Sequence, residues 1–288
     1  AGSDMALFKT FDKYFGYTKK CLMETTYRFG EPAIAESSKF ILANPEQAVK
    51  NVHSFWDDAE TTLDFLATDG REGVVETVKY LADQIPADKE ILLLGRYGFD
   101  VNIFKNTELA VHDGQNGTYV TYGRRRMNFM TVHQSKGLEC DYIILLNCNG
   151  GTIGFPSQIS DSPVLKYVLS EPDAYAFSEE RRVFYVGITR AKKHTWVLYD
   201  INNPSPFVKE FVQTLEPETK PCAVIPESEL CPKCHCGRIR VIKKGRAVNG
   251  NPYTTYVCSN EKYGCDYLET KFVNLNSTHR TPRKKIGY

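Results

Sequence analysis

The sequence has no long hydrophobic run, no internal repeat and no low-complexity tract. No apolar stretch approaches the roughly 18 residues that a membrane-spanning helix needs, and no secretory hydrophobic region stands near the start. With 42% hydrophobic and 25% charged residues among 288, the composition excludes extended disorder, collagen and coiled coil. We therefore expect a soluble, cytoplasmic protein of one or two domains with no membrane partner.

The chain also has almost no net charge, but the near-zero total of +1 conceals an uneven distribution. Positions 231–288 hold 12 Lys and Arg against 3 Asp and Glu, which is +9. Positions 1–230 hold 24 against 32, which is −8. A compact basic tail on an acidic body predicts an appendage that binds a polyanion.

The nine cysteines do not form an even framework, and five of them fall between positions 231 and 265. An odd number with a cluster in the tail favours metal ligation over disulfides. The spacing C-x2-C, 23 residues, C-x6-C predicts a tetrahedral Zn²⁺ site, with ligands Cys231, Cys234, Cys258 and Cys265. His235 or Cys236 could replace Cys234, and the alternative to a metal site is a set of unrelated buried thiols.

The segments between these cysteines, 238–244 and 253–257, alternate like short β-strands, so we expect a small β zinc ribbon over 231–288. Lysines and arginines alternate there with aromatic residues, a pattern that suits single-stranded nucleic acid. The alternatives are a solvated basic surface whose aromatic residues serve packing, or a module that binds protein. Prolines and acidic residues at 216–230 predict a linker before the ribbon.

Upstream of this linker, short apolar runs alternate with helical patterns. The runs at 91–94, 129–132, 142–146 and 195–199 predict buried strands. Proline starts, acidic first turns and basic last turns predict helices at about 32–43, 72–84 and 178–193. This alternation predicts a three-layer α/β domain with a parallel sheet.

Two polar segments in this domain are difficult to explain as core. The first, Thr131-Val-His-Gln-Ser-Lys-Gly-Leu-Glu139, follows a predicted strand, and ligands of open α/β sheets bind at that edge. The second runs from Glu179 to Lys192, where helical periodicity aligns Gly187 with Arg190. An arginine placed in this way predicts contact with an anion, and a structural ion pair is the alternative.

With Glu24-Thr-Thr-Tyr-Arg28, these segments resemble motifs IV, V and VI of the UvrD/Rep family of superfamily 1 helicases. The resemblance runs in order from residue 1 to about 215 and is strongest to members of the helicase IV type. It implies a RecA-like, P-loop NTPase-like fold, the second of two helicase domains. It also implies ATP with Mg²⁺ as cofactor and 3′ to 5′ translocation.

The resemblance assigns nucleotide contacts to several residues. It implies that Arg190 reaches the γ-phosphate as an arginine finger does, and that Arg28 is a second γ-phosphate contact. Tyr27 would stack on the adenine and Glu139 would bind the ribose hydroxyl. Lys136 and Gly137 are further candidates at the nucleotide, although Lys136 could instead contact DNA.

The family's contacts to single-stranded DNA fall on Thr131 and His133, with Arg96 as a weaker candidate. The large accessory subdomain of UvrD and Rep must be absent or minimal, because only about 100 residues separate Arg28 from Thr131. The basic tail resembles the four-cysteine zinc ribbon of bacterial type I topoisomerases, with a slightly longer second cysteine pair.

No G-x-x-x-x-G-K-[ST] sequence occurs, so the phosphate-binding loop is missing. The chain opens Ala-Gly-Ser-Asp, with its first Met at position 5, which indicates a trimmed chain or the back part of a longer protein. We expect an inactive fragment of a monomeric helicase whose partners are tailed duplex DNA and its own N-terminal RecA-like domain. The alternative is an ATP-driven factor that remodels RNA polymerase or another nucleoprotein complex.

Overall fold

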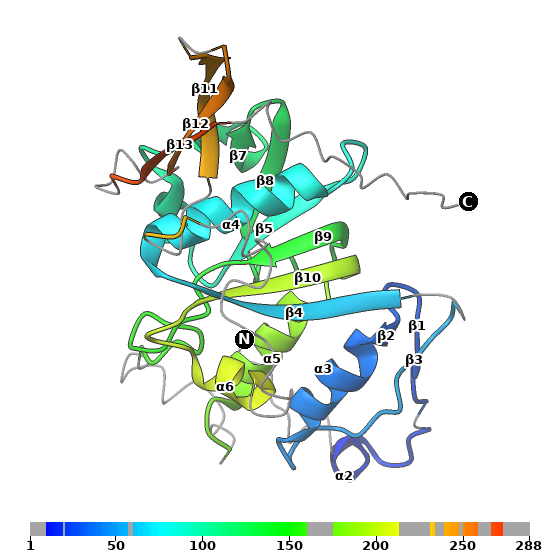
Figure 1. The fold of residues 1–288 in the computed structure, drawn as a ribbon. Helices are drawn as coiled ribbons and strands as arrows, with labels where there is room; N and C mark the ends of the chain where they lie inside the picture. Colours follow the sequence, from blue (N-terminus) through cyan, green and yellow to red (C-terminus); the bar gives the residue numbers. More distant parts are fainter. Residues whose placement is uncertain are drawn as a thin grey trace, which may run out of the picture. The chain divides into compact units, whose positions relative to one another are not determined.

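The computed structural model divides the chain into two compact units, Ala1–Val224 and Ile225–Tyr288, which are described separately below (Figure 1). It describes residues 10–19, 21–56, 60–159, 175–212, 231–233, 239–247, 250–258 and 266–272. The expected linker at 216–230 lies outside these ranges. None of the described helices is both long enough and apolar enough to cross a membrane.

An eight-stranded, mostly parallel sheet forms the centre of the first unit, with strand order β2-β4-β10-β9-β5-β8-β7-β6. Neighbouring strands from β2 to β8 run parallel, whereas β7 pairs antiparallel with both β8 and β6. This confirms the α/β class. The strands are β2 (Glu31–Pro32), β4 (Glu60–Thr68), β5 (Ile91–Gly95), β6 (Ala110–Gly114), β7 (Gly117–Tyr122), β8 (Arg125–Thr131), β9 (Cys140–Leu145) and β10 (Ala191–Asp200).

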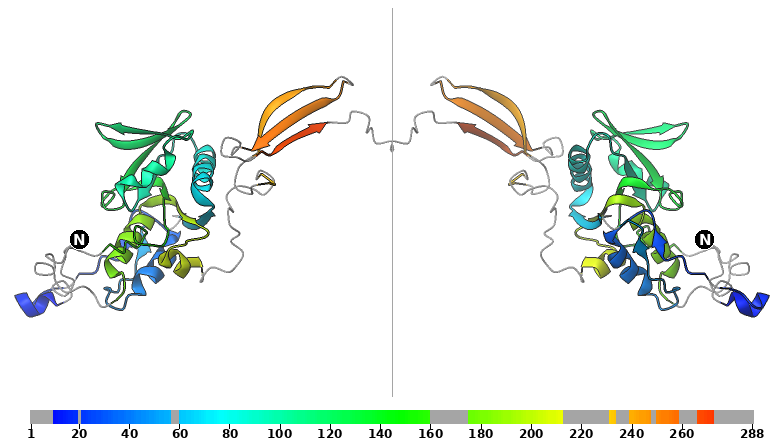
Figure 2. Two further views of the ribbon diagram at one scale, coloured as in Figure 1. Left: turned by 90° about the vertical axis from the view of Figure 1, so that its left-hand side faces the viewer. Right: turned by 90° about the vertical axis from the view of Figure 1, so that its right-hand side faces the viewer.

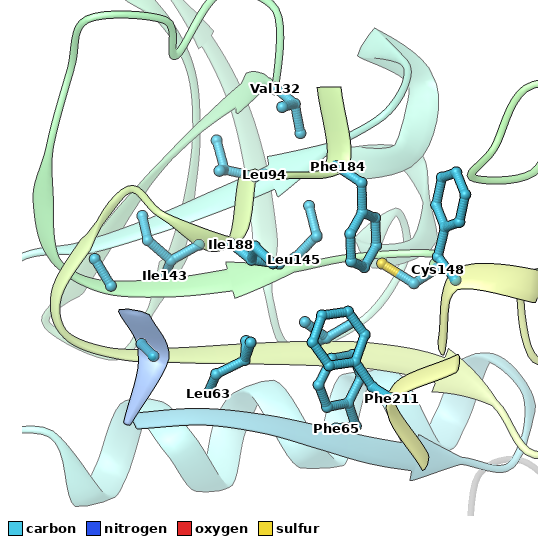
Figure 3. Close-up of a cluster of buried hydrophobic side chains, with 14 of the residues drawn as sticks. Leu63, Phe65, Leu94, Val132, Ile143, Leu145, Cys148, Phe184, Ile188 and Phe211 are labelled. Atoms are coloured by element: carbon cyan, nitrogen blue, oxygen red, sulfur yellow. The ribbon is translucent and has the colours of Figure 1, made fainter. Parts of the chain in front are cut away.

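Helices cover both faces of this sheet, as the alternation of side chains along its central strand shows. In β5, Leu92 and Leu94 pack into one core and Ile91 and Leu93 into the other. The first core, shown in Figure 3, also contains residues of α3 (Ala33–Leu42), α5 (Ser178–Ile188) and α6 (Pro206–Val212). The second contains residues of α4 (Gly70–Gln84) and the 3-10 helix η1 (Gly98–Phe104). The domain therefore has three layers.

Several parts of this unit differ from the sequence prediction. The third predicted helix is too long: α5 ends at Ile188, because Ala191 already begins β10 by pairing with Cys140 of β9. Strand β4 and the β6–β7 hairpin were not predicted. A two-stranded sheet of β1 (Thr25–Thr26) and β3 (His53–Ser54), and the short helix α2 (Phe11–Phe15), were also missed.

The second unit contains a three-stranded antiparallel sheet, visible in Figure 2. Its strands are β11 (Ile239–Arg246), β12 (Pro252–Cys258) and β13 (Leu268–Phe272). Both strands predicted between the cysteines are therefore present. Cys231 and Cys258 are fully buried, whereas Cys234, Cys265, His235 and Cys236 lie outside the described residues.

Candidate functional site

A cleft of about 900 Å³ opens on the first unit and is lined by three separate segments of the chain. One segment lies between Met23 and Val52, the second includes the loop after β8, and the third is the end of α5 with the two residues after it. The cleft brings together five of the predicted nucleotide-site residues. These are Tyr27, Arg28, Lys136, Glu139 and Arg190.

Arg190 lies at the junction between α5 and β10 and is only 8% exposed. Its Nε donates to the carbonyl of Val186 at 2.8 Å, and its Nη1 donates to the carbonyl of Leu138 at 3.2 Å. Burial and then the charge of Arg28 lower the pKa of Arg190 to about 10. Arg190 is thus held rigidly in the wall of the cleft and remains cationic at neutral pH.

Glu139 lies between two basic side chains. Its Oε1 is 2.7 Å from Nζ of Lys192, and its Oε2 is 3.5 Å from Nε of Arg28. The hydrogen bond from Lys192 is the main reason that the pKa of Glu139 is lowered. The sequence predicted Lys192 at the end of a helix and not at the site. The pairing of β10 with β9 brings this residue beside Glu139.

The cleft has a strong excess of positive charge. Among the described residues that line it, Glu139 is the single acidic one, against five basic residues. The basic residues are Arg28, Lys50, Lys136, Arg182 and Arg190. Cations in a partly buried cavity attract anions more strongly than they do in water, because the local dielectric constant is lower. The cleft therefore suits a ligand with several negative charges.

Exposed aromatic rings cluster around Tyr27, which lines the cleft. Tyr27 is 65% exposed, and its ring centroid is 4.5 Å from that of Phe55. Trp56 contacts Phe55 at 4.8 Å and donates its indole N–H to the carbonyl of Tyr27 at 3.3 Å. Phe55 and Trp56 were not identified from the sequence, although two adjacent aromatic residues just after a short strand were a usable signal. Together these residues form an exposed aromatic cluster in which the ring planes of Phe55 and Trp56 are nearly perpendicular, at 89°.

The predicted DNA contacts lie outside the cleft, at the carboxyl ends of β5 and β8. Thr131 pairs with Gly95, and its hydroxyl donates to Oε1 of Gln134 at 3.0 Å. Arg96 makes two hydrogen bonds to the carboxylate of Glu180, at 2.9 and 2.7 Å. Burial, and then the positive charge of Arg96, lower the pKa of His133.

The loop from Thr131 to Glu139 joins these two regions. His133 lies within the electrostatic influence of Arg96, whereas Lys136 and Glu139 line the cleft. Gly137 has a φ of +89°, a conformation that glycine adopts without steric strain. One loop therefore reaches both candidate binding regions.

The described residues of the second unit include only two of the four predicted zinc ligands, Cys231 and Cys258. Cys231 is fully buried, and the N–H of Lys233 donates to its sulfur at 3.4 Å, so the first cysteine pair begins in a tight turn. Buried sulfur ligands on tight turns are the donor set that Zn²⁺ prefers. Within the described ranges, no three His, Cys, Asp or Glu side chains form a group that could hold a metal ion. Two of the four predicted ligands lie outside those ranges.

Comparison with known proteins supports the helicase resemblance. Residues 100–201 match the family described as UvrD-like helicase C-terminal domain. DNA helicase IV of Escherichia coli K12 is 29% identical over 209 residues, which cover 73% of this chain and 29% of that protein. A probable DNA helicase II homolog of Rickettsia conorii is 41% identical over 73 residues, 25% of this chain and 10% of the relative.

A crystal structure of the C-terminal domain of a possible DNA helicase from Lactobacillus plantarum overlaps 64% of this chain and 92% of its own, at 17% identity and a TM-score of 0.37. The chain spans less than a third of the two curated relatives just described. The sequence matches are thus to DNA helicases, and the matched family model is that of the UvrD-like C-terminal domain. The matched range 100–201 includes Lys136, Glu139 and Arg190 but not Tyr27 or Arg28.

Proposed function

We propose that this chain is the C-terminal motor part of an ATP-dependent DNA helicase that translocates 3′ to 5′. The observation that carries the proposal is the cleft, whose described lining contains five basic residues from three segments and one carboxylate. Arg28 and Arg190 repel each other there, and this repulsion contributes to the lowered pKa of Arg190. A bound polyphosphate would relieve the repulsion, which favours an anionic ligand between the two guanidinium groups.

In this proposal different residues of the cleft bind the adenine, the ribose and the phosphates of the nucleotide. The ring of Tyr27, backed by Phe55, stacks on the adenine. Arg190 and Arg28 contact the γ-phosphate, and Lys136 adds positive charge near the phosphates. Glu139 keeps Arg28 and Lys192 in place, and since an ionised carboxylate has about four lone-pair positions, it can also accept a hydrogen bond from the ribose.

The other half of the ATP site would come from an N-terminal RecA-like domain. That domain would supply the glycine-rich loop and the Mg²⁺-binding carboxylate, because the 288 residues contain no G-x-x-x-x-G-K-[ST] sequence. Closure of the two domains would bring Arg190 onto the γ-phosphate, where a guanidinium stabilises the charge of the transferring group. Thr131 and His133 would contact single-stranded DNA at the neighbouring edge of the sheet.

Two activity measurements test this function. The full-length protein should hydrolyse ATP faster when single-stranded DNA is present, and it should displace a strand from a duplex with a 3′ tail. The 288-residue chain alone should do neither, because its cleft holds the phosphates from one side only. DNA-stimulated ATPase from this chain alone would contradict the proposal, as would a full-length protein without DNA-dependent ATPase.

We further propose that the second unit binds one Zn²⁺ through Cys231, Cys234, Cys258 and Cys265 and adds affinity for DNA. Two observations support this proposal: Cys231 and Cys258 are fully buried, and the unit contains a three-stranded sheet. Metal analysis of protein purified without chelator should return one zinc per chain, and Cys231→Ser should abolish it. A Cys140→Ser variant, which changes a buried thiol of the first unit, should keep its zinc. Metal-free wild-type protein would refute the site.

A further inference from the structure

Two stacked aromatic rings lie at the carboxyl end of β5, outside the basic cleft. The ring centroids of Tyr97 and Phe99 are 4.9 Å apart, and their planes are inclined by only 8°. Tyr97 is partly buried, whereas Phe99 is 51% exposed. The Phe99 ring therefore offers a large apolar surface to solvent at an edge where α/β sheets bind ligands.

A closed hydrogen-bond network holds the inner ring of this pair. The Tyr97 hydroxyl donates to Oγ of Ser157 at 2.7 Å, and the Ser157 N–H donates to Glu180 at 2.9 Å. Glu180 also accepts both hydrogen bonds from Arg96, whose guanidinium lies 5.0 Å from the centre of the Tyr97 ring. Such an arrangement fixes the orientation of the rings before any ligand arrives.

The backbone beneath the rings is held as firmly. The Tyr97 N–H donates to Oδ2 of Asp100 at 2.8 Å, and Asn147 donates to Oδ1 at 3.0 Å. Asp100 packs so closely against Gly95 that a Cβ at position 95 would lie 2.7 Å from its side chain. Phe99 therefore projects from the first turn of the 3-10 helix η1, which these contacts anchor to the sheet.

The aromatic pair lies next to the residues expected to face DNA. Strand β5 pairs with β8 in a register that places Gly95 opposite Thr131, and the N–H of Val132 donates to the carbonyl of Gly95 at 2.9 Å. The charge of Arg96 lowers the pKa of His133 and the charge of Glu180 raises it, so both groups lie near His133. The rings and the two expected DNA contacts thus share one edge of the sheet.

We propose that Phe99 stacks on an unpaired base of single-stranded DNA, with Tyr97 holding the ring in place. The inference rests on the proposed function and adds a base contact from a residue outside the three helicase-like motifs. A ring already fixed by its neighbours loses little conformational entropy on stacking, and every base offers a π-face, so the contact would be independent of sequence. Arg96, whose guanidinium is paired with Glu180, acts here as a positioning residue.

Binding of fluorescent oligo(dT) and of an oligonucleotide carrying 2-aminopurine, both by the full-length protein, tests this contact. Phe99→Leu keeps an apolar side chain but removes the ring, and should weaken binding about tenfold. Phe99→Trp should restore it. Wild-type protein should quench 2-aminopurine at one position of the bound strand, and Phe99→Leu should lose that quenching. Placing an abasic nucleotide at that position should weaken wild-type binding but leave the Phe99→Leu variant nearly unchanged.

Thermal melting of each variant controls for folding, because loss of the ring could disturb Tyr97. A folded Phe99→Leu variant that binds within twofold of wild type and still quenches 2-aminopurine overturns the inference alone, since DNA binding itself is intact. A full-length wild-type protein that does not bind single-stranded DNA overturns both this inference and the proposed function.

Discussion

Replacing Arg190 by alanine in the full-length protein is expected to lower kcat for DNA-stimulated ATP hydrolysis by about 10³-fold, the range found when an arginine finger is lost. Its guanidinium is held by Val186 and Leu138 through Nε and Nη1, and no hydrogen bond joins Nη2 to another described residue. Arg190 lines the cleft and keeps N–H donors that make no hydrogen bond within the described residues, so charge developing on the γ-phosphate would be stabilised without rearrangement.

Because Arg190 also bonds two backbone carbonyls, a lysine variant separates catalysis from folding. Arg190→Lys keeps the charge but loses the planar fork, so we expect most of the activity to be lost while the melting temperature is close to that of wild type. Arg124→Ala, in an exposed turn after β7, is the matched control and should hydrolyse ATP normally. Steady-state ATPase assays measure both. Activity of Arg190→Ala within tenfold of wild type would rule out its proposed role.

Replacing Lys79 by methionine is expected to destabilise the first unit by about 3–5 kcal/mol, the usual cost of breaking a buried ion pair from one side. Lys79 lies on α4 and is only 4% exposed. Its Nζ is 3.0 Å from the buried carboxylate of Glu76 and 2.6 Å from the carboxylate of Glu108, whose side chain is 39% exposed. Burial lowers the pKa of Lys79, but the bond to Glu108 and the charge of Glu76 outweigh it and raise the pKa overall.

The sign of the pKa change sets the pH range of this effect. A raised pKa means that the contribution of Lys79 is present below its unfolded pKa of roughly 10.4 and is lost as the pH rises through the folded value. Urea unfolding at pH 7 therefore measures it in full. The double variant Glu76→Gln/Lys79→Met should recover part of the loss, because the buried carboxylate of Glu76 is then replaced by a neutral amide, and the carboxylate of Glu108 is partly exposed to water. Lys89→Met, which removes an exposed pair with Asp88, should change little.

Local signals in the sequence predicted the central strands and the main helices. Strands β5 and β9 are apolar on both faces because helices cover both faces of the sheet, and a continuous apolar run records that burial directly. Pro32 predicted the start of helix α3, and Asn44 and Pro45 predicted its end. The β6–β7 hairpin was missed although Asp113-Gly114-Gln115-Asn116-Gly117 is a recognisable turn between alternating segments.

The candidate site was predicted by motif and not by geometry. Tyr27, Arg28, Lys136, Glu139 and Arg190 were identified one by one, and the structure places them around one cleft. Lys192 and Phe55 were missed because their places depend on strand pairing, β10 with β9 for the former and β3 with β1 for the latter. Arg96 was expected to face DNA, but its pairing with Glu180, far along the chain, engages its guanidinium.

The sequence by itself determined the α/β class, the motif residues and the contrast between an acidic body and a basic tail. These features follow from periodicity, spacing and composition, which are local properties of the chain. Only the tertiary structure decided that α5 ends before Arg190, that the described lining of the cleft combines one carboxylate with five basic residues, and that Phe99 stacks on Tyr97 at the sheet edge. Those outcomes depend on which distant strands become neighbours, and the order of strands in a sheet is set by the packing of the whole domain.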